Sequence, residues 1–178
     1  ILTLIITMVA QPLVNLLASE KFNGSVILVF PLVMGLAIQA VSWVTEIGIG
    51  ISKRSHLNLY SFASNLIVTI LGIYFLTPIL GILGVGLAVM VGFLTKALVA
   101  SYLAQYAYKL DWSYRPVIMI MLVTLLFGLA SVSMQHISDF TSSNLILFLG
   151  IIVIISVGWM VLLNRNERKR VLSIIRIS

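Results

Sequence analysis

The chain has 178 residues, of which 61% are hydrophobic and only 9% are charged. A soluble domain of this length cannot bury so much apolar surface, so the composition indicates an integral membrane protein. Cysteine is absent, which excludes disulfides, thiolate zinc sites and cysteine nucleophiles. The net charge of +6 does not predict nucleic acid as a partner, because basic residues in membrane proteins gather in cytoplasmic loops.

Six apolar stretches, separated by polar connectors, approach or exceed the length of about 20 residues that a membrane-crossing helix needs. We therefore predict an all-α membrane protein with six transmembrane helices within residues 1–163, followed by a basic cytoplasmic tail at 164–178. The predicted spans are 1–18, 25–51, 57–77, 82–107, 116–136 and 145–163.

The basic residues fall almost entirely on one side of these spans. The second and fourth connectors hold Lys53, Arg54, Lys109 and Arg115, and the tail holds five more, whereas the other side holds only Lys21. The positive-inside rule then predicts a cytoplasmic basic surface and places both termini in the cytoplasm. The remaining basic residue is Lys96, which belongs to neither side.

Small and polar residues recur at helical spacing in the first four spans, one stripe on each helix. Contact faces between membrane helices collect such residues, so we expect the stripes to face protein rather than lipid. They are Thr3, Thr7, Gln11 and Asn15; Gly35, Gln39, Ser42, Glu46 and Gly50; Ser61, Asn65, Thr69 and Gly72; and Gly84, Ala88, Gly92, Lys96, Ala100 and Ala104.

Lys96 starts near the centre of the bilayer, roughly 18 Å from either end of its span at 1.5 Å per residue. A charge at that depth costs about 2.5 to 3.5 kcal/mol on insertion scales, so it requires a reason. The lysine can snorkel, although its side chain leans toward the N-terminal end and the distance exceeds its reach. It can form a structural salt bridge with Glu46, whose expected depth matches imperfectly. It can also face a cavity and meet anionic cargo or take part in ion coupling.

Glu46 has two interpretations of its own. It is a proton or cation site inside the bundle, or an interfacial carboxylate held by Lys53 and Arg54. No metal-ligand or catalytic constellation emerges, since His56 and His136 fall on opposite sides of the membrane. We therefore expect neither an enzyme nor a cofactor.

Residues 16–109 carry an order of features that resembles a known family. A small loop with Glu20 and Phe22 opens the segment, and a helix then ends in Gly48 and Gly50 before a short basic loop. A helix containing Asn65 runs into "TPILGILGVGLA" and a long helix. The segment looks like the C-terminal half of bacterial polysaccharide biosynthesis proteins, the O-antigen-type lipid-linked oligosaccharide flippases of the multidrug/oligosaccharidyl-lipid/polysaccharide exporter superfamily.

The resemblance implies a transporter of two six-helix lobes in the bacterial inner membrane, of which this chain supplies one. Its cargo would be a polyprenyl-diphosphate-linked oligosaccharide for surface polysaccharide, and its partners membrane lipids and either a missing N-terminal lobe or a second copy. Because the chain starts at Ile1 rather than a methionine, we expect it to be the C-terminal part of a longer protein. A lysine suits a diphosphate cargo, so the expected cavity residues are Lys96, Gln39, Asn65 and possibly Glu46.

Two alternatives remain open. A cation-coupled multidrug antiporter of the same superfamily should depend on an intramembrane acid, for which Glu46 is the candidate. A non-transporting membrane subunit that assembles partners should depend on Lys96 only for stability.

Overall fold

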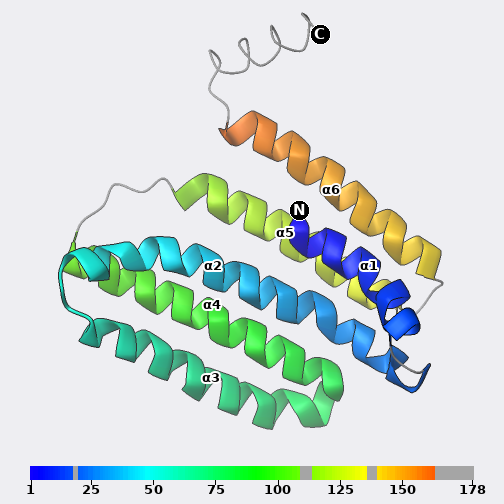
Figure 1. Cartoon of the computed structure of the whole chain (residues 1–178), viewed down its shortest axis with the longest axis horizontal. Helices are drawn as coiled ribbons and strands as arrows, with labels where there is room; N and C mark the ends of the chain where they lie inside the picture. The colour runs from blue at the N-terminus through cyan, green and yellow to red at the C-terminus, as the bar shows by residue number, and fades with distance from the viewer. Residues whose placement is uncertain (18–19, 109–113, 136–139, 163–178) are drawn as a thin grey trace, which may run out of the picture. The chain divides into compact units, whose positions relative to one another are not determined.

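The computed structural model describes residues 1–17, 20–108, 114–135 and 140–162. Within these ranges the chain is helical apart from short connections such as the turn at residues 52–55, and it contains no strand, which confirms the predicted all-α class. The elements are α1 (Leu2–Leu17), the 3₁₀ helix η1 (Glu20–Leu28), α2 (Val29–Ile51), α3 (His56–Leu80), α4 (Ile82–Ala107), α5 (Tyr114–Gln135) and α6 (Phe140–Leu162), drawn in Figure 1.

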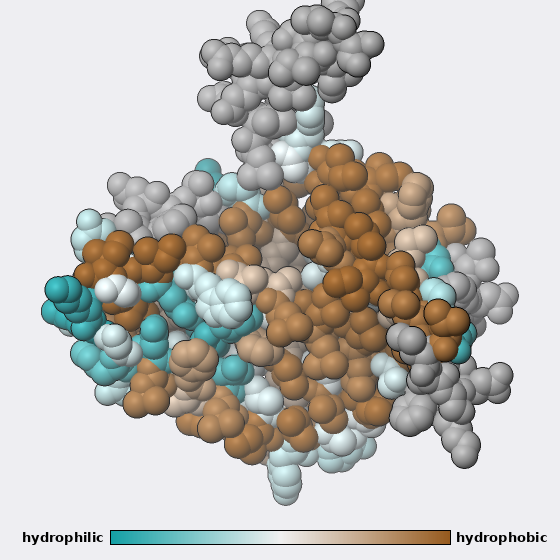
Figure 2. All heavy atoms as spheres, viewed as in Figure 1, coloured by the Kyte–Doolittle hydropathy of each residue, from teal (hydrophilic) through white to brown (hydrophobic). Residues whose placement is uncertain are grey.

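Four helical segments in the described ranges are long and apolar enough to cross a membrane, namely Gly24–Ile51, His56–Leu80, Ile82–Ala107 and Arg115–Ser133. The stretches Leu2–Leu16 and Ser143–Trp159 are apolar but shorter. Apolar side chains also cover most of the face seen in Figure 2, as expected of a surface that meets lipid. The chain is therefore compatible with a multi-pass membrane protein.

The predicted helix boundaries differ most from the structure at the starts of the second and sixth spans, and α6 begins at Phe140 rather than at residue 145. The second span differs for a reason visible in the sequence. Its α-helical part begins at Val29 rather than at residue 25, because Glu20–Leu28 forms the 3₁₀ helix η1. Gly24 and Ser25 lie inside η1, and both residue types are weaker helix formers than the apolar residues that follow. The predicted tail at 164–178 and Lys109 lie outside the described residues.

The chain divides into two compact units, one of Ile6–Asp111 and one of Ile1–Ile5 with Trp112–Ser178. The first, which we call the three-helix unit, contains α2, α3 and α4. There α4 lies between α2 and α3 and packs along both, whereas α2 and α3 touch each other little (Figure 1). In the second unit α5 packs against α6, and Ser131 Oγ lies 2.7 Å from Ser143 Oγ.

Close packing in the three-helix unit follows the predicted stripe of small residues on α4, which is buried along its whole length. A Cβ added to Gly72 of α3 would lie 2.8 Å from the Cβ of Ala88, and one added to Gly92 would collide with Thr69 and Asn65. These contacts bring the predicted stripes of α3 and α4 face to face. Membrane helices approach this closely only where side chains are small.

Two predicted stripes fail at their ends. Gly50 on α2 is exposed, and so is Asn15 on α1, whereas Thr3 and Thr7 are buried as predicted. Both exposed residues lie in the last turn of their helix, where a helix can emerge from its neighbours. In the last turn, the position within the helix therefore determines exposure more than the helical spacing of the stripe does.

Candidate functional site

The candidate site is the layer of the three-helix unit around Lys96. Its side chain is 0% exposed even though it carries a charge, and it belongs to the buried ridge of α4. Lys96 Nζ lies 3.0 Å from Oε1 of Glu46, whose side chain is 13% exposed. Of the three interpretations of Lys96, the salt bridge to Glu46 is therefore the one that the structure forms.

Helix register explains how these two side chains meet. The helices α2 and α4 run parallel, with Thr45 level with Ser101 and Ile49 packed with Ala104. Lys96 is five residues, or about 7.5 Å, before Ser101 along α4, so Glu46 starts at a different depth. Helical side chains lean toward the N-terminus, which carries the Glu46 carboxylate toward the level of Lys96.

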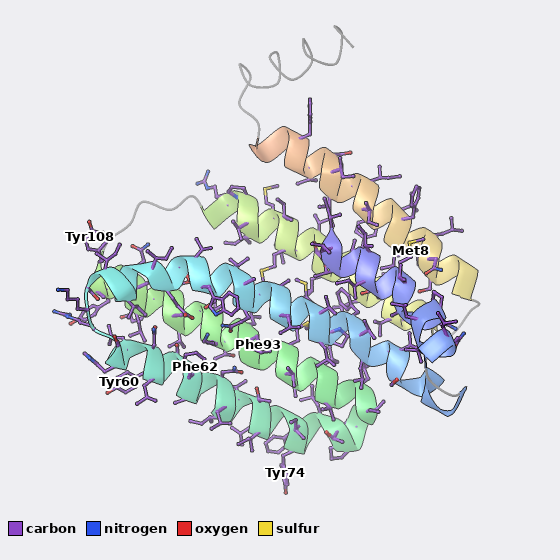
Figure 3. All side chains as sticks on the ribbon, viewed as in Figure 1. Met8, Tyr60, Phe62, Tyr74, Phe93 and Tyr108 are labelled. Carbon is purple, nitrogen blue, oxygen red and sulfur yellow. The ribbon has the colours of Figure 1, made fainter. Side chains whose placement is uncertain are left out.

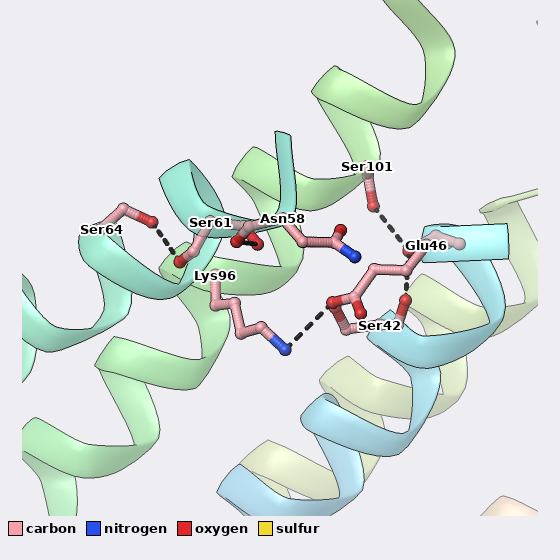
Figure 4. Close-up of polar contacts among 8 residues, drawn as sticks. Ser42, Glu46, Asn58, Ser61, Ser64, Lys96 and Ser101 are labelled. Atoms are coloured by element: carbon pink, nitrogen blue, oxygen red, sulfur yellow. Dashed lines mark hydrogen bonds and ion pairs between the residues drawn. The ribbon is translucent and has the colours of Figure 1, made fainter. Parts of the chain in front are cut away.

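A chain of hydroxyl groups supports the Glu46 carboxylate in this orientation. Ser42 Oγ, one turn earlier on α2, donates a hydrogen bond of 2.8 Å to Glu46 Oε1. Thr45 Oγ1 donates to the carbonyl oxygen of Ser42 at 2.8 Å, and Ser101 Oγ of α4 donates to Thr45 Oγ1 at 3.4 Å (Figure 4). The carboxylate is thus held by Ser42 of its own helix α2 and contacts α4 directly through Lys96.

The third helix contributes an aromatic ring to the ammonium group. Lys96 Nζ lies 4.0 Å from the centroid of the Phe62 ring of α3, which is within the range of a cation–π interaction. Phe62 itself is 51% exposed, so one edge of the ring faces outward while its face meets the charge. The ion pair is therefore enclosed by all three helices.

Hydrogen bonding in this layer is incomplete among the described residues. Lys96 Nζ is within ion-pair distance of Glu46 but has no acceptor in good hydrogen-bond geometry, and Oε1 of Gln39 and Oδ1 of Asn58 have no donor. In Figure 4 the Asn58 side chain points toward Glu46. A buried acceptor without a donor costs free energy of folding, so these oxygen atoms can each accept a further hydrogen bond.

The sequence-predicted cavity residues are brought together only in part. Lys96 and Glu46 are in direct contact. Gln39 is buried on the same face of α2 as Glu46, seven residues earlier, whereas Asn65 accepts a hydrogen bond of 3.1 Å from Thr69 beside Gly92. Asn65 therefore belongs to the α3–α4 contact, one turn of α4 away from the lysine.

The predicted basic surface is exposed where it is described. Lys53 and Arg54 are exposed in the turn between α2 and α3, and Arg115 is exposed at the start of α5. The ion pair of Glu46 is with Lys96 and not with Lys53 or Arg54, because the glutamate leans away from that turn.

Two contributors to the site were missed by sequence reasoning. Phe62 lies off the polar stripe of α3, and its exposure is that of a lipid-facing residue. Ser101 follows Ala100 on α4 but is not part of the small-residue ridge. Neither position carries a signal in a single sequence, because both contacts depend on how α2, α3 and α4 are offset along their axes.

Comparison with protein-family models, curated proteins and solved structures finds no match for this chain. The geometry of the site and the resemblance carried by residues 16–109 are therefore the guides to function.

Proposed function

We propose that this chain is one lobe of a membrane flippase that moves polyprenyl-diphosphate-linked oligosaccharides across the bacterial inner membrane. The observation that carries the proposal is the buried Lys96–Glu46 pair in the interior of the three-helix unit. Ionisable residues within membrane spans are costly and mark transport pathways more often than they serve structure alone. The resemblance of residues 16–109 to O-antigen-type flippases supplies the class of cargo.

The pair also suggests how cargo would engage the lobe. In the conformation described, Glu46 neutralises Lys96, so the ammonium has no charge to spare for a ligand. A diphosphate carries more negative charge than one carboxylate and would compete for the ammonium in a low-dielectric layer. In this proposal the pair opens during transport, and a second lobe or a second copy of the chain forms the other side of the pathway.

A cation-coupled antiporter is the second candidate, and one observation favours it. Glu46 is an intramembrane carboxylate whose positive partner is a flexible lysine, so a proton or a cationic drug could take the lysine's place. The flippase candidate depends on Lys96, whereas the antiporter candidate depends on Glu46.

Complementation of a flippase-null strain tests the proposal through single substitutions in the gene that encodes this chain. Surface polysaccharide is scored after equal membrane levels of each variant have been verified. If anionic cargo binds Lys96, Lys96→Met should abolish polysaccharide export, whereas Glu46→Gln should retain most of it because the freed ammonium still meets the diphosphate. Loss with Glu46→Gln alone supports cation coupling, and full activity of both variants contradicts a transport role for the pair.

A further inference from the structure

One end of the three-helix unit combines cationic and aromatic side chains, and we call it the turn end. It comprises the turn at residues 52–55 with the adjoining ends of α2, α3 and α4. Ile49, Leu57 and Ala104 pack together there, which places the end of α2, the start of α3 and the end of α4 at one level. Hydrophilic residues gather at this end of the unit, on the left of Figure 2.

The turn end carries two cations that have no carboxylate partner among the described side chains. Lys53 and Arg54 are both exposed, and both lie in the short turn that reverses the chain. Among residues whose side chains are described, Glu46 is the one acid, and it pairs with Lys96. Within the described part of the chain, no side chain neutralises the charges of Lys53 and Arg54.

Exposed tyrosines surround the same end. Tyr60 lies one turn into α3, Tyr102 and Tyr106 lie near the end of α4, and Tyr108 follows that helix. Figure 3 shows Tyr60 and Tyr108 at this end, whereas Tyr74 projects from α3 farther along. A tyrosine has an apolar ring and a polar hydroxyl group, so exposed tyrosines at the end of a membrane helix favour the headgroup level of the bilayer.

The opposite end of the unit lacks this combination. Around Leu28, Leu80 and Ile82 no described side chain is a lysine or an arginine, although the chain turns there as well. Among the side chains that the structure describes, cations and a cluster of tyrosines thus coincide at the turn end alone. This asymmetry is what the positive-inside rule expects of a cytoplasmic end.

We propose that the turn end binds the phosphate headgroups of acidic phospholipids in the surrounding bilayer, with Lys53 and Arg54 contacting the phosphates and the exposed tyrosines lying at headgroup level. A bilayer presents many phosphates in one plane, which suits two cations on a projecting turn. Such cations are attracted to an anionic leaflet, and the attraction strengthens binding about fivefold per residue.

Native mass spectrometry of the purified full chain measures this binding directly, with phosphatidylglycerol as the acidic lipid and phosphatidylcholine as the zwitterionic one. Phosphatidylglycerol should bind more tightly. Lys53→Gln should weaken its binding about fivefold and the double variant Lys53→Gln/Arg54→Gln roughly thirtyfold, with phosphatidylcholine binding unchanged. Lys21→Gln is the matched control, because it removes the same charge from another connector and should leave phosphatidylglycerol binding unchanged.

Three results would overturn the proposal. The double variant binds phosphatidylglycerol as the parent chain does, or Lys21→Gln loses as much affinity as Lys53→Gln. Alternatively, millimolar inorganic phosphate displaces the lipid more strongly than chloride at equal ionic strength, which would identify a site for small anions.

The depth of the tyrosines provides a second, independent measurement. Because the chain has no cysteine, Tyr106→Cys can be spin-labelled alone in bilayers and compared with Leu98→Cys, an exposed position eight residues earlier on α4. The label at 106 should be accessible to a water-soluble relaxation agent and the label at 98 to oxygen. Equal accessibility to both agents at the two positions would place the turn end away from the interface.

Discussion

Three helices surround the charged side chain of Lys96. The free energy of unfolding therefore depends on each partner of this side chain remaining in place. Glu46 supplies the opposite charge at 3.0 Å, and Phe62 covers the ammonium from α3. Removing one member of a buried ion pair leaves an uncompensated charge, which typically costs about 3 to 5 kcal/mol. Removing both members leaves no such charge.

This asymmetry predicts strong coupling between the two residues. Lys96→Met and Glu46→Gln should each lower the free energy of unfolding by a few kcal/mol, with Glu46→Gln the more harmful because its remaining partner is fully buried. The double variant should lose less than the sum of the two single losses, by about 1 to 3 kcal/mol. Unfolding in mixed detergent micelles, followed by the fluorescence of the three tryptophans, measures each value.

Substitution of a nearby exposed cation supplies the control for that cycle. Arg54→Gln removes a charge in the turn at residues 52–55 and should change stability by less than about 0.5 kcal/mol. Additive losses for Lys96 and Glu46 would show that the two side chains do not interact energetically.

The prediction that Lys96 faces protein could be made from its place in the ridge from Gly84 to Ala104, since spacing alone identifies a shared face. Its partner could not be chosen from the sequence. The depth of Glu46 was estimated from its own span, and only the offset of α2 against α4 and the lean of the glutamate toward Ser42 reconcile the two depths.

At the scale of helices, the contact between α3 and α4 depends on the absence of side chains. A Cβ at Gly72 would lie 2.8 Å from the Cβ and 3.2 Å from the Cα of Ala88, so neither backbone can yield without separating the helices. Gly50 has no atom within 4 Å of the same position. Gly50, in the last turn of α2, therefore serves as the comparison position that has no neighbouring helix.

Gly72→Ala should therefore destabilise the three-helix unit, whereas Gly50→Ala should not. Overpacking costs about 1 to 3 kcal/mol, partly offset by the roughly 1 kcal/mol that alanine gains over glycine in a helix. We expect a net loss of about 1 kcal/mol at position 72 and a small gain at position 50, measured by unfolding in mixed micelles. A loss of equal size at both positions would mean that helix flexibility, and not the contact with Ala88, is what the glycines provide.

Helix spans could be predicted closely because length and apolar composition dominate the signal in a membrane protein. The stripes on α3 and α4 were also predictable, since both helices use their small residues where they meet. Phe62 was not, because an aromatic residue that is half exposed has the same sequence pattern whether it faces lipid or covers a charge.

At the scale of the whole molecule, the predicted topology follows from the distribution of basic residues. Helix α2 has 23 residues and is about 34 Å long at 1.5 Å per residue, enough to cross the hydrocarbon core. Its two ends should therefore lie on opposite sides of the membrane, with the turn at residues 52–55 in the cytoplasm together with the basic tail. The absence of cysteine makes this orientation measurable one position at a time.

Single cysteines at the two ends of α2 should react from opposite sides. Gly24→Cys, at an exposed position of η1 with open space around it, should react with a membrane-impermeant maleimide added to intact cells. Ser55→Cys, exposed before α3, and Ser173→Cys, in the tail, should react only after the membrane is permeabilised. Leu98→Cys, which is exposed in the middle of α4, should react poorly in both conditions because a maleimide needs a hydrated thiolate.

Labelling of Ser55→Cys in intact cells would reverse the predicted orientation, and labelling of Gly24→Cys and Ser55→Cys from the same side would show that α2 does not cross the membrane. Ser173→Cys decides the rest of the topology, because an even number of crossings after Ser55 is required to return the tail to the cytoplasm.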